Sequence, residues 1–231
     1  MYRKSALAVW AIVSLLALVC SRRIPLQGTR QELEKAFKAK YGANTMIVWN
    51  NATNCVSRLD GKFATHHVVT DTLAAIRVVM GFLKENRGLL GTGGTDLRLR
   101  RVWTMGVGEY GVDFDEYFEG IRVEHAETRV ELQRDGTVIG VGSRYVPDIN
   151  VSVVPAITLI DAVSAAARSF AAEPYVPRGS APSVGLVIYP IRSESPVACH
   201  LAWCVDYGSY TYFIDAVDGS QIERRQNFIS D

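Results

Sequence analysis

Histidine and cysteine, from which many catalytic and metal sites are built, are scarce in this chain, with four of each among 231 residues. No His-Glu-x-x-His string is present, so the two-histidine helix that binds zinc in many hydrolases has no counterpart here. The Gly-x-Ser-x-Gly string of many serine hydrolases and the Walker-type phosphate loop do not occur either. The sequence therefore predicts a protein that is not an enzyme, with no cofactor and no metal site.

An excess of charge of one sign is also missing, because the formal net charge is +1. A balanced chain lacks the basic surface that nucleic-acid binding requires, so we expect no nucleic-acid partner. Apolar residues make up 48% of the sequence, which is enough for one large or two small hydrophobic cores.

The only long uncharged apolar run follows Arg3 and Lys4 and covers residues 5–19. A basic start, a short apolar run and a small polar end predict a secretory signal peptide over residues 1–21. The run is shorter than the roughly 20 residues that span a bilayer. The chain is thus predicted to be secreted or extracytoplasmic, in the periplasm or at the cell surface. An uncleaved segment, which would tether it to a membrane, is the alternative.

Three cysteines remain after a signal peptide that contains Cys20 is removed, namely Cys55, Cys199 and Cys204. In an extended stretch the last two would have α-carbons about 16 Å apart, beyond the ~7 Å limit for a disulfide. A bridge from Cys55 to either one and three unpaired thiols both stay open.

The predicted N-terminal unit, residues 22–62, combines a helix with a hairpin. Thr29 and Glu32 have the spacing of a capping box, and Gly42 ends the helical pattern, so a helix is expected over residues 29–41. Two β-rich runs, residues 45–49 and 55–59, flank a polar turn and predict a hairpin.

A second helix is predicted between residues 64 and 90, on apolar residues spaced by three and four. They are Val69, Leu73, Ile76, Met80 and Leu83. The stretch 86–88 supplies the signals that end it.

Three β-rich runs follow between residues 112 and 147, separated by the turn pairs Glu119–Gly120 and Asp135–Gly136. Apolar positions in the middle run change from odd to even numbers, which predicts a β-bulge near Glu124 and His125. The product is an antiparallel meander with one packed face and one wet face.

A similar arrangement is predicted after a linker at residues 147–155. Thr158 and Asp161 mark a helix start, and residues 184–189, 200–207, 210–216 and 220–224 read as β runs. The predicted fold class is α+β, with two small lobes, each a helix packed on an antiparallel meander of the PepSY/cystatin-like kind. The domain boundaries would be 63–148 and 149–231.

Several motifs resemble those of one known family. Residues 117–123, Tyr-Phe-Glu-Gly-Ile-Arg-Val, with Ala126-Glu127 and Asp135-Gly136, are similar to the core motif in propeptides of thermolysin-like and fungalysin metallopeptidases, the FTP domain. Residues 82–91 are similar to the end of the preceding helix in that family, and residues 201–205 and 212–219 resemble the PepSY domain. The chain departs from the family at Asp115, where Gln is usual, at Arg122, where Pro is usual, and at Glu124–His125 in place of an aromatic–Gly pair. The motif residues that the resemblance marks for interaction are Tyr117, Gly120, Val123, Ala126, Glu127 and Gly136.

The resemblance implies a non-catalytic propeptide-like protein. Its partner would be the catalytic domain of a thermolysin-like zinc metallopeptidase, joined to it in a longer precursor or met in trans, and its role inhibition, folding assistance or both. The tail from Arg224 to Asp231 would contribute to binding and be dispensable for folding. The alternative is an extracytoplasmic binding module for an unrelated protein.

Four other features are predicted to be structural. Gly106, Gly108 and Gly111 fit a dinucleotide-binding string, but a β run follows them where a helix would be needed, so a turn is expected. The adjacent His66 and His67 are expected to be exposed at a helix start. The acidic residues of the meander are expected to form a solvated strand face, with no calcium site; they are Asp113, Asp115, Glu116 and Glu119. The aromatic residues between 203 and 213 are expected to be mostly core.

Overall fold

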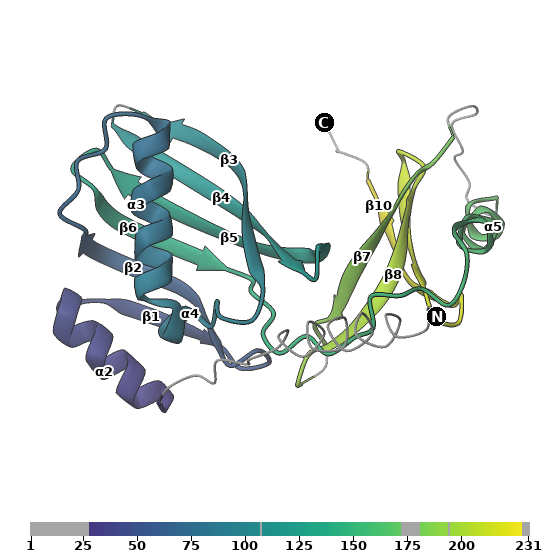
Figure 1. The fold of residues 1–231 in the computed structure, drawn as a ribbon, viewed down its shortest axis with the longest axis horizontal. Coiled ribbons are helices and arrows are strands. Elements are labelled where there is room, and N and C mark those ends of the chain that lie inside the picture. Colours follow the sequence, from purple (N-terminus) through teal and green to yellow (C-terminus); the bar gives the residue numbers. More distant parts are fainter. Residues whose placement is uncertain (1–27, 107, 172–180, 194, 228–231) are drawn as a thin grey trace, which may run out of the picture.

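The computed structural model describes residues 28–106, 108–171, 181–193 and 195–227 (Figure 1). The predicted signal peptide and Cys20 lie outside the described residues, as do the last four residues of the chain. Within the described ranges, no helix is long and apolar enough to cross a membrane.

The N-terminal helix and hairpin form as the sequence predicts. Helix α2 (Arg30–Tyr41) begins at the capping box of Thr29 and Glu32, and the N–H of Gly42 bonds to the Lys38 carbonyl at its end. Strands β1 (Met46–Asn50) and β2 (Cys55–Ala64) pair antiparallel.

The second helix is shorter than predicted, and the prediction of which side chains it buries holds in part. Val69 and Leu83 are buried, and Ile76 packs against the core. Helix α3 (Thr72–Glu85) begins only after Asp71, whose carboxylate accepts a hydrogen bond from Ala74 N, and the short α4 (Arg87–Leu90) follows. The expected core residues Leu73 and Met80 are 68% and 44% exposed. The buried face consists of Ala74, Ala75, Val78, Val79, Phe82 and Leu83. Two of these residues are alanines, which a pattern of large apolar residues does not detect.

The central meander forms with the predicted turns and bulge. Strands β3 (Asp96–Met105), β4 (Glu109–Phe118), β5 (Ile121–Gln133) and β6 (Thr137–Ser143) pair antiparallel in chain order, and β2 pairs with the far side of β6. The β4–β5 register jumps between Asp115 opposite Glu127 and Tyr117 opposite Arg122. His125 takes a φ of +56° inside this jump, so the predicted bulge is confirmed. The residues after Gly108 form strand β4, as expected of a turn.

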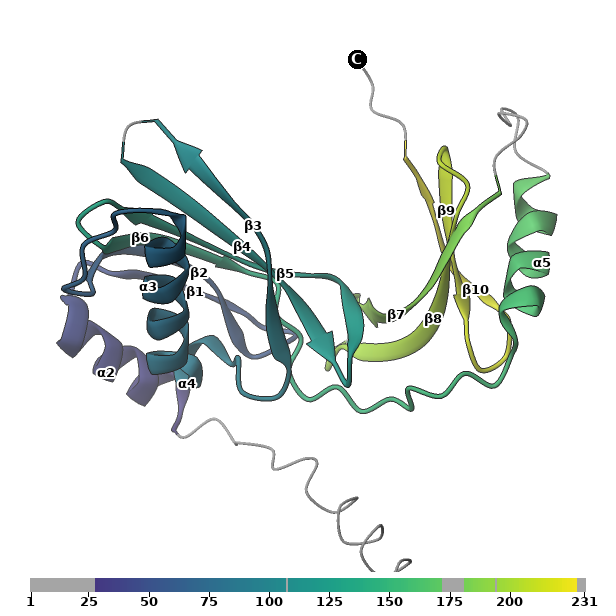
Figure 2. The same ribbon diagram turned by 45° about the horizontal axis from the view of Figure 1, so that its top comes forward.

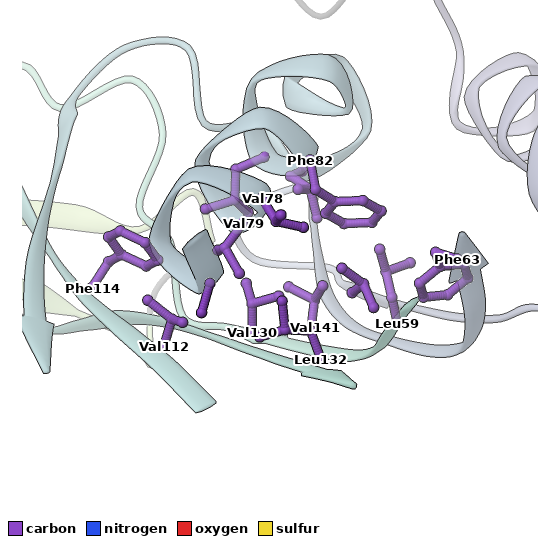
Figure 3. Close-up of a cluster of buried hydrophobic side chains, with 14 of the residues drawn as sticks. Leu59, Phe63, Val78, Val79, Phe82, Val112, Phe114, Val130, Leu132 and Val141 are labelled. Atoms are coloured by element: carbon purple, nitrogen blue, oxygen red, sulfur yellow. The ribbon is translucent and has the colours of Figure 1, made fainter. Parts of the chain in front are cut away.

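The largest core lies between this meander and the helices. Side chains from α2, α3 and α4 pack on the face of the sheet that carries Val112, Phe114, Val130 and Leu132. Figure 3 shows Val78, Val79 and Phe82 above these strand residues, with Leu59 and Phe63 of β2 closing the cluster. Every buried member of this core falls between Phe37 and Val141.

The C-terminal part contains α5 (Leu159–Phe170) and strands β7 (Ser183–Ile191), β8 (Ala198–Asp206), β9 (Tyr210–Asp215) and β10 (Gln221–Gln226). The four strands pair antiparallel in chain order. Helix α5 has the predicted capping box of Thr158 and Asp161 and packs its alanines, Ala162 and Ala166, against a core that includes Tyr210 and Tyr212. The prediction that these aromatics are mostly core is confirmed.

A short parallel contact joins the two halves. Arg122 and Val123 of β5 pair with Val187 and Ile188 of β7, so the ten described strands form one sheet (Figure 2). Helices α2, α3 and α4 lie at one end of the molecule and α5 at the other. The α+β class is confirmed. The strand pairing, however, is continuous where the sequence predicted two separate meanders.

Candidate functional site

The six motif residues lie on or beside strand β5, but only some of them reach the surface. Val123 and Ala126 are buried in a small apolar cluster with Val146 and Ile188, where β5 meets β7. Their role is therefore packing at the junction between the two halves.

Tyr117, Gly120 and Glu127 are the motif residues that solvent can reach. Gly120 is exposed at the tip of the β4–β5 hairpin with a φ of +85°, a conformation that side chains resist. The Arg98 guanidinium lies over the Tyr117 ring at 4.1 Å from its centroid, and Arg100 Nη1 lies 3.1 Å from Glu127 Oε2. Both contacts come from the neighbouring strand β3.

These residues belong to one face of the sheet, which we name the polar sheet face. It consists of Arg98, Arg100 and Arg101 on β3, Asp113, Asp115 and Tyr117 on β4, and Glu127 and Arg129 on β5. A register shift between Leu99 and Arg101 lets both Arg100 and Arg101 contribute to this face. Successive residues of β4 point to opposite faces, so this is the side opposite Val112 and Phe114. In the described part of the chain, α2, α3 and α4 all pack on the other side.

Asp113 is the centre of the polar sheet face. It is 2% exposed and accepts hydrogen bonds from Arg101 Nε at 2.7 Å, Arg129 Nε at 2.8 Å and Trp103 Nε1 at 3.3 Å. Burial alone would raise the pKa of Asp113, but the bonds from Arg129, Arg101 and Trp103 outweigh it and hold the pKa below its usual value. Asp113 therefore stays ionised and fixes two arginines whose side chains remain about half exposed.

The outer edge of strand β3 borders this face. Among the described residues β3 pairs only with β4, so its other edge carries unpaired backbone groups. Such an edge can pair with an extended segment of another protein. Exposed ion pairs add little to stability, typically about 0–1 kcal/mol, so the arginines along this edge contribute mainly directional hydrogen-bond donors.

The bulge in β5 gathers a second charged group at the junction. Glu124 is 4% exposed and accepts hydrogen bonds from Arg122 and, at 3.2 Å, from Arg225 Nη1 on β10. Arg225 Nη1 also lies 3.1 Å from His125 Nε2. Burial lowers the pKa of His125, although Glu124 acts in the opposite direction. Strand β10 is thereby tied to β5, which argues against the expectation that the tail from Arg224 is dispensable for folding.

Glu116 is a buried acid that the sequence prediction placed on a solvated face. It is 0% exposed, its Oε2 accepts a hydrogen bond from Val146 N at 3.0 Å, and its Oε1 accepts one from Thr95 Oγ1 at 3.0 Å. Burial raises the pKa of Glu116 to about 8, against the effect of both bonds. The solvated-face prediction also fails for Asp113, because the burial of both residues depends on partners distant in sequence.

Catalytic groupings among the described residues are incomplete. His200 Nδ1 lies 2.7 Å from Asp215 Oδ2, a pairing that orients a general base in many hydrolases. Asp215 also accepts a hydrogen bond from Val217 N, and within the described ranges no hydroxyl or thiol bonds to the His200 ring. No cluster of three metal-ligating side chains occurs in the described part of the chain.

The three described cysteines are unpaired thiols, so the disulfide from Cys55 that the sequence left open does not form. Cys55 lies in the N-terminal half beside Gly91, while Cys199 and Cys204 are on β8. Burial raises the pKa of Cys55 to about 12 and that of Cys199 and Cys204 to about 11. These thiols stay protonated at neutral pH and are poor nucleophiles.

No family model matches the chain, and no curated protein matches its sequence. Among solved structures, the Bacillus megaterium YpeB C-terminal domain is similar over 85% of this chain and 95% of that chain, with 15% sequence identity and a TM-score of 0.38. Similarity at this level assigns neither a family nor a function.

Proposed function

We propose that this chain is a non-catalytic, secreted protein that binds the catalytic domain of a thermolysin-like zinc metallopeptidase and acts as its inhibitor, its folding chaperone or both. The observation that carries the proposal is the placement of Tyr117, Gly120 and Glu127. These motif residues lie at the surface of the β4–β5 hairpin, next to strand β3, whose outer edge is unpaired among the described residues. Arg98 and Arg100 of β3 contact Tyr117 and Glu127.

The physical basis is differential binding. A protein that binds only the native peptidase stabilises that state by about 2.7 kcal/mol when its free concentration is one hundred times the dissociation constant. If the same surface covers the substrate cleft, inhibition accompanies folding assistance. An extended peptidase segment that pairs with the edge of β3 would satisfy its backbone groups, and the arginines would bind acidic side chains near it.

The proposal includes a two-lobe organisation. The separate cores, one within residues 37–141 and one within residues 162–214, support lobes similar to FTP and PepSY domains. Residues 1–21 would be removed as a signal peptide, leaving the mature protein outside the cytoplasm. N-terminal sequencing of the protein recovered from its native compartment tests this part.

The decisive experiment titrates the chain without residues 1–21 against several thermolysin-like peptidases. We expect inhibition at micromolar protein, or faster recovery of activity when the denatured peptidase refolds in its presence. The double variant Arg98→Gln/Arg100→Gln should weaken either effect at least tenfold. The matched control Lys35→Gln/Lys84→Gln removes the same charge from exposed positions on the helical side and should leave the effect unchanged.

Failure to inhibit and failure to assist refolding for every peptidase would reject this partner. An unpaired strand edge beside arginines is not specific for a peptidase, so an extracytoplasmic binding module for an unrelated protein is the second candidate. It predicts that a binding partner without peptidase activity is lost in the Arg98→Gln/Arg100→Gln variant and kept in the control.

A further inference from the structure

An open cavity of about 620 Å³ lies on the helical side of the molecule, away from the polar sheet face. Its walls come from the end of α2, the end of β2 with the loop that follows, and the middle of α3. Its apolar lining residues are Tyr41, Val78 and Phe82, of which Tyr41 is half-buried and the other two are buried. The volume falls in the range of about 300–1,000 Å³ that is typical of sites for small molecules.

The charged groups of the cavity are mostly cationic. Lys40, Lys62 and Arg77 line it together with a single carboxylate, Glu85. Glu85 pairs with Lys40 and also lies 3.5 Å from Tyr41 Oη. In the described part of the chain, neither Lys62 nor Arg77 has a carboxylate within ion-pair distance, so two cations outside any salt bridge line the cavity.

Two further acids lie near these cations, but both already have hydrogen-bond partners. Asp71 accepts a hydrogen bond from Ala74 N at the start of α3. Asp135 accepts one from Thr137 N in the β5–β6 turn. Hydrogen bonds from Ala74 and Thr137 are the main reason that the pKa values of Asp71 and Asp135 are lowered, with Arg77 and Lys62 adding only weakly. Because Asp71 and Asp135 interact only weakly with Arg77 and Lys62, both cations remain available to a ligand.

The loop that carries His66 and His67 forms a fixed third wall. Thr65 Oγ1 donates to the Gly136 carbonyl at 2.8 Å, and Val69 N donates to the Arg134 carbonyl at 2.8 Å. A side chain at Gly136 would place its Cβ 1.7 Å from the His67 carbonyl oxygen, so only glycine permits this contact. The loop is thus held in position before any ligand arrives, with two imidazoles on the cavity wall.

We propose that this cavity binds a small organic anion that carries a phosphate or carboxylate group on an apolar body. Lys62 and Arg77 would hold the anionic group, with hydrogen bonds from the imidazoles, and the apolar body would lie against Tyr41. The site is separate from the polar sheet face and does not depend on the peptidase proposal.

Calorimetric titration of the chain without residues 1–21 tests the proposal, with 2-naphthyl phosphate and 2-naphthoate as probes. We expect at least one of them to bind, and neutral 2-naphthol to bind at least tenfold more weakly. The variant Lys62→Gln/Arg77→Gln should reduce probe affinity at least tenfold. The control Lys84→Gln/Arg87→Gln removes the same charge from α3 and α4 outside this cavity and should bind like the parent chain.

Gly81→Leu provides a test that changes no charge. Gly81 lines the cavity from α3, and a Cβ built on it meets no atom within 4 Å, so a larger side chain fits and fills the space. We expect it to reduce binding at least tenfold while circular dichroism and the melting temperature show an intact fold. The proposal is overturned if neither anion binds, if 2-naphthol binds equally well, if the control loses as much affinity as the pocket variant, or if Gly81→Leu binds normally.

Discussion

At the scale of single residues, the two most buried acids of strand β4 behave in opposite ways. Asp113 is ionised because two arginines bond to it, whereas the hydrogen-bond donors to Glu116 among the described residues are neutral and come from Thr95 and Val146. The pKa of Asp113 is lowered and that of Glu116 is raised to about 8. Two acids three residues apart on one strand therefore change the free energy of unfolding in opposite directions as the pH changes.

Glu116 should make the protein less stable as pH rises from about 5 to 8. Its pKa is raised to about 8 on folding, so the stabilisation is complete below the unfolded pKa and is lost as pH rises through the folded pKa. In Glu116→Gln, the side-chain oxygen can still accept the hydrogen bond from Val146 N, and the amide group can bond to Thr95. The glutamine does not titrate. Urea unfolding at pH 5, 6, 7 and 8 should show that the free energy of unfolding of the variant increases relative to that of the parent chain as the pH rises.

Asp113→Asn is the matched control for that measurement. The folded pKa of Asp113 is lowered, so its stabilisation is present above the unfolded pKa and is lost only as the pH falls through the folded pKa. Asp113→Asn should therefore lower the free energy of unfolding by the same amount at every pH between 5 and 8. If the difference in free energy of unfolding between Glu116→Gln and the parent chain is constant over the same pH range, Glu116 is not buried in its neutral form.

At the scale of secondary-structure elements, the turns and the bulge were predictable because their signals are local. The Asp–Gly pair and the change of phase within one run specify β5 and its turns from adjacent residues alone. The burial of Asp113 depends on Arg101, and that of Glu116 on Val146, which lie 12 and 30 positions away in sequence. The β5–β7 pairing involves two residues per strand and leaves no local pattern, so it could not be predicted.

The two turn glycines allow backbone strain to be separated from a steric contact. Gly120 and Gly136 have φ values of +85° and +80°, and alanine in this region costs about 1–2 kcal/mol. A Cβ on Gly120 meets nothing within 4 Å, while one on Gly136 meets the His67 carbonyl. Gly136→Ala should therefore lower the free energy of unfolding by at least 1 kcal/mol more than Gly120→Ala does, since the loop must shift. If both substitutions lower the free energy of unfolding equally in urea, the close approach of the new Cβ to the His67 carbonyl does not destabilise the protein.

At the scale of the whole molecule, strand β10 joins parts of the chain that are far apart in sequence. Arg225 reaches Glu124 across 101 positions, and Asn227 Nδ2 donates to Asp206 Oδ1 at 3.1 Å and to Thr211 Oγ1 at 2.8 Å. The last described residues therefore hold the C-terminal sheet together and link it to the bulge.

Loss of the end of strand β10 should destabilise the protein. Removing residues 224–231 deletes Arg225 and Asn227 and leaves the buried Glu124 with Arg122 as its remaining arginine partner among the described residues, which should cost on the order of 3 kcal/mol. Differential scanning calorimetry of the truncated and full chains measures this loss. An unchanged melting temperature would mean that β10 does not couple the two halves.

The placement of the cores has a consequence for synthesis on the ribosome. All buried members of the larger core precede residue 142, so that core can close while β7 to β10 are still untranslated. Among the described residues, however, Glu124 has Arg122 as its one arginine partner until Arg225 emerges, some hundred residues later. A nascent chain thus passes through a long interval in which the core can be complete while the acid at its edge has one of its two arginine partners, and the arrival of β10 ends that interval.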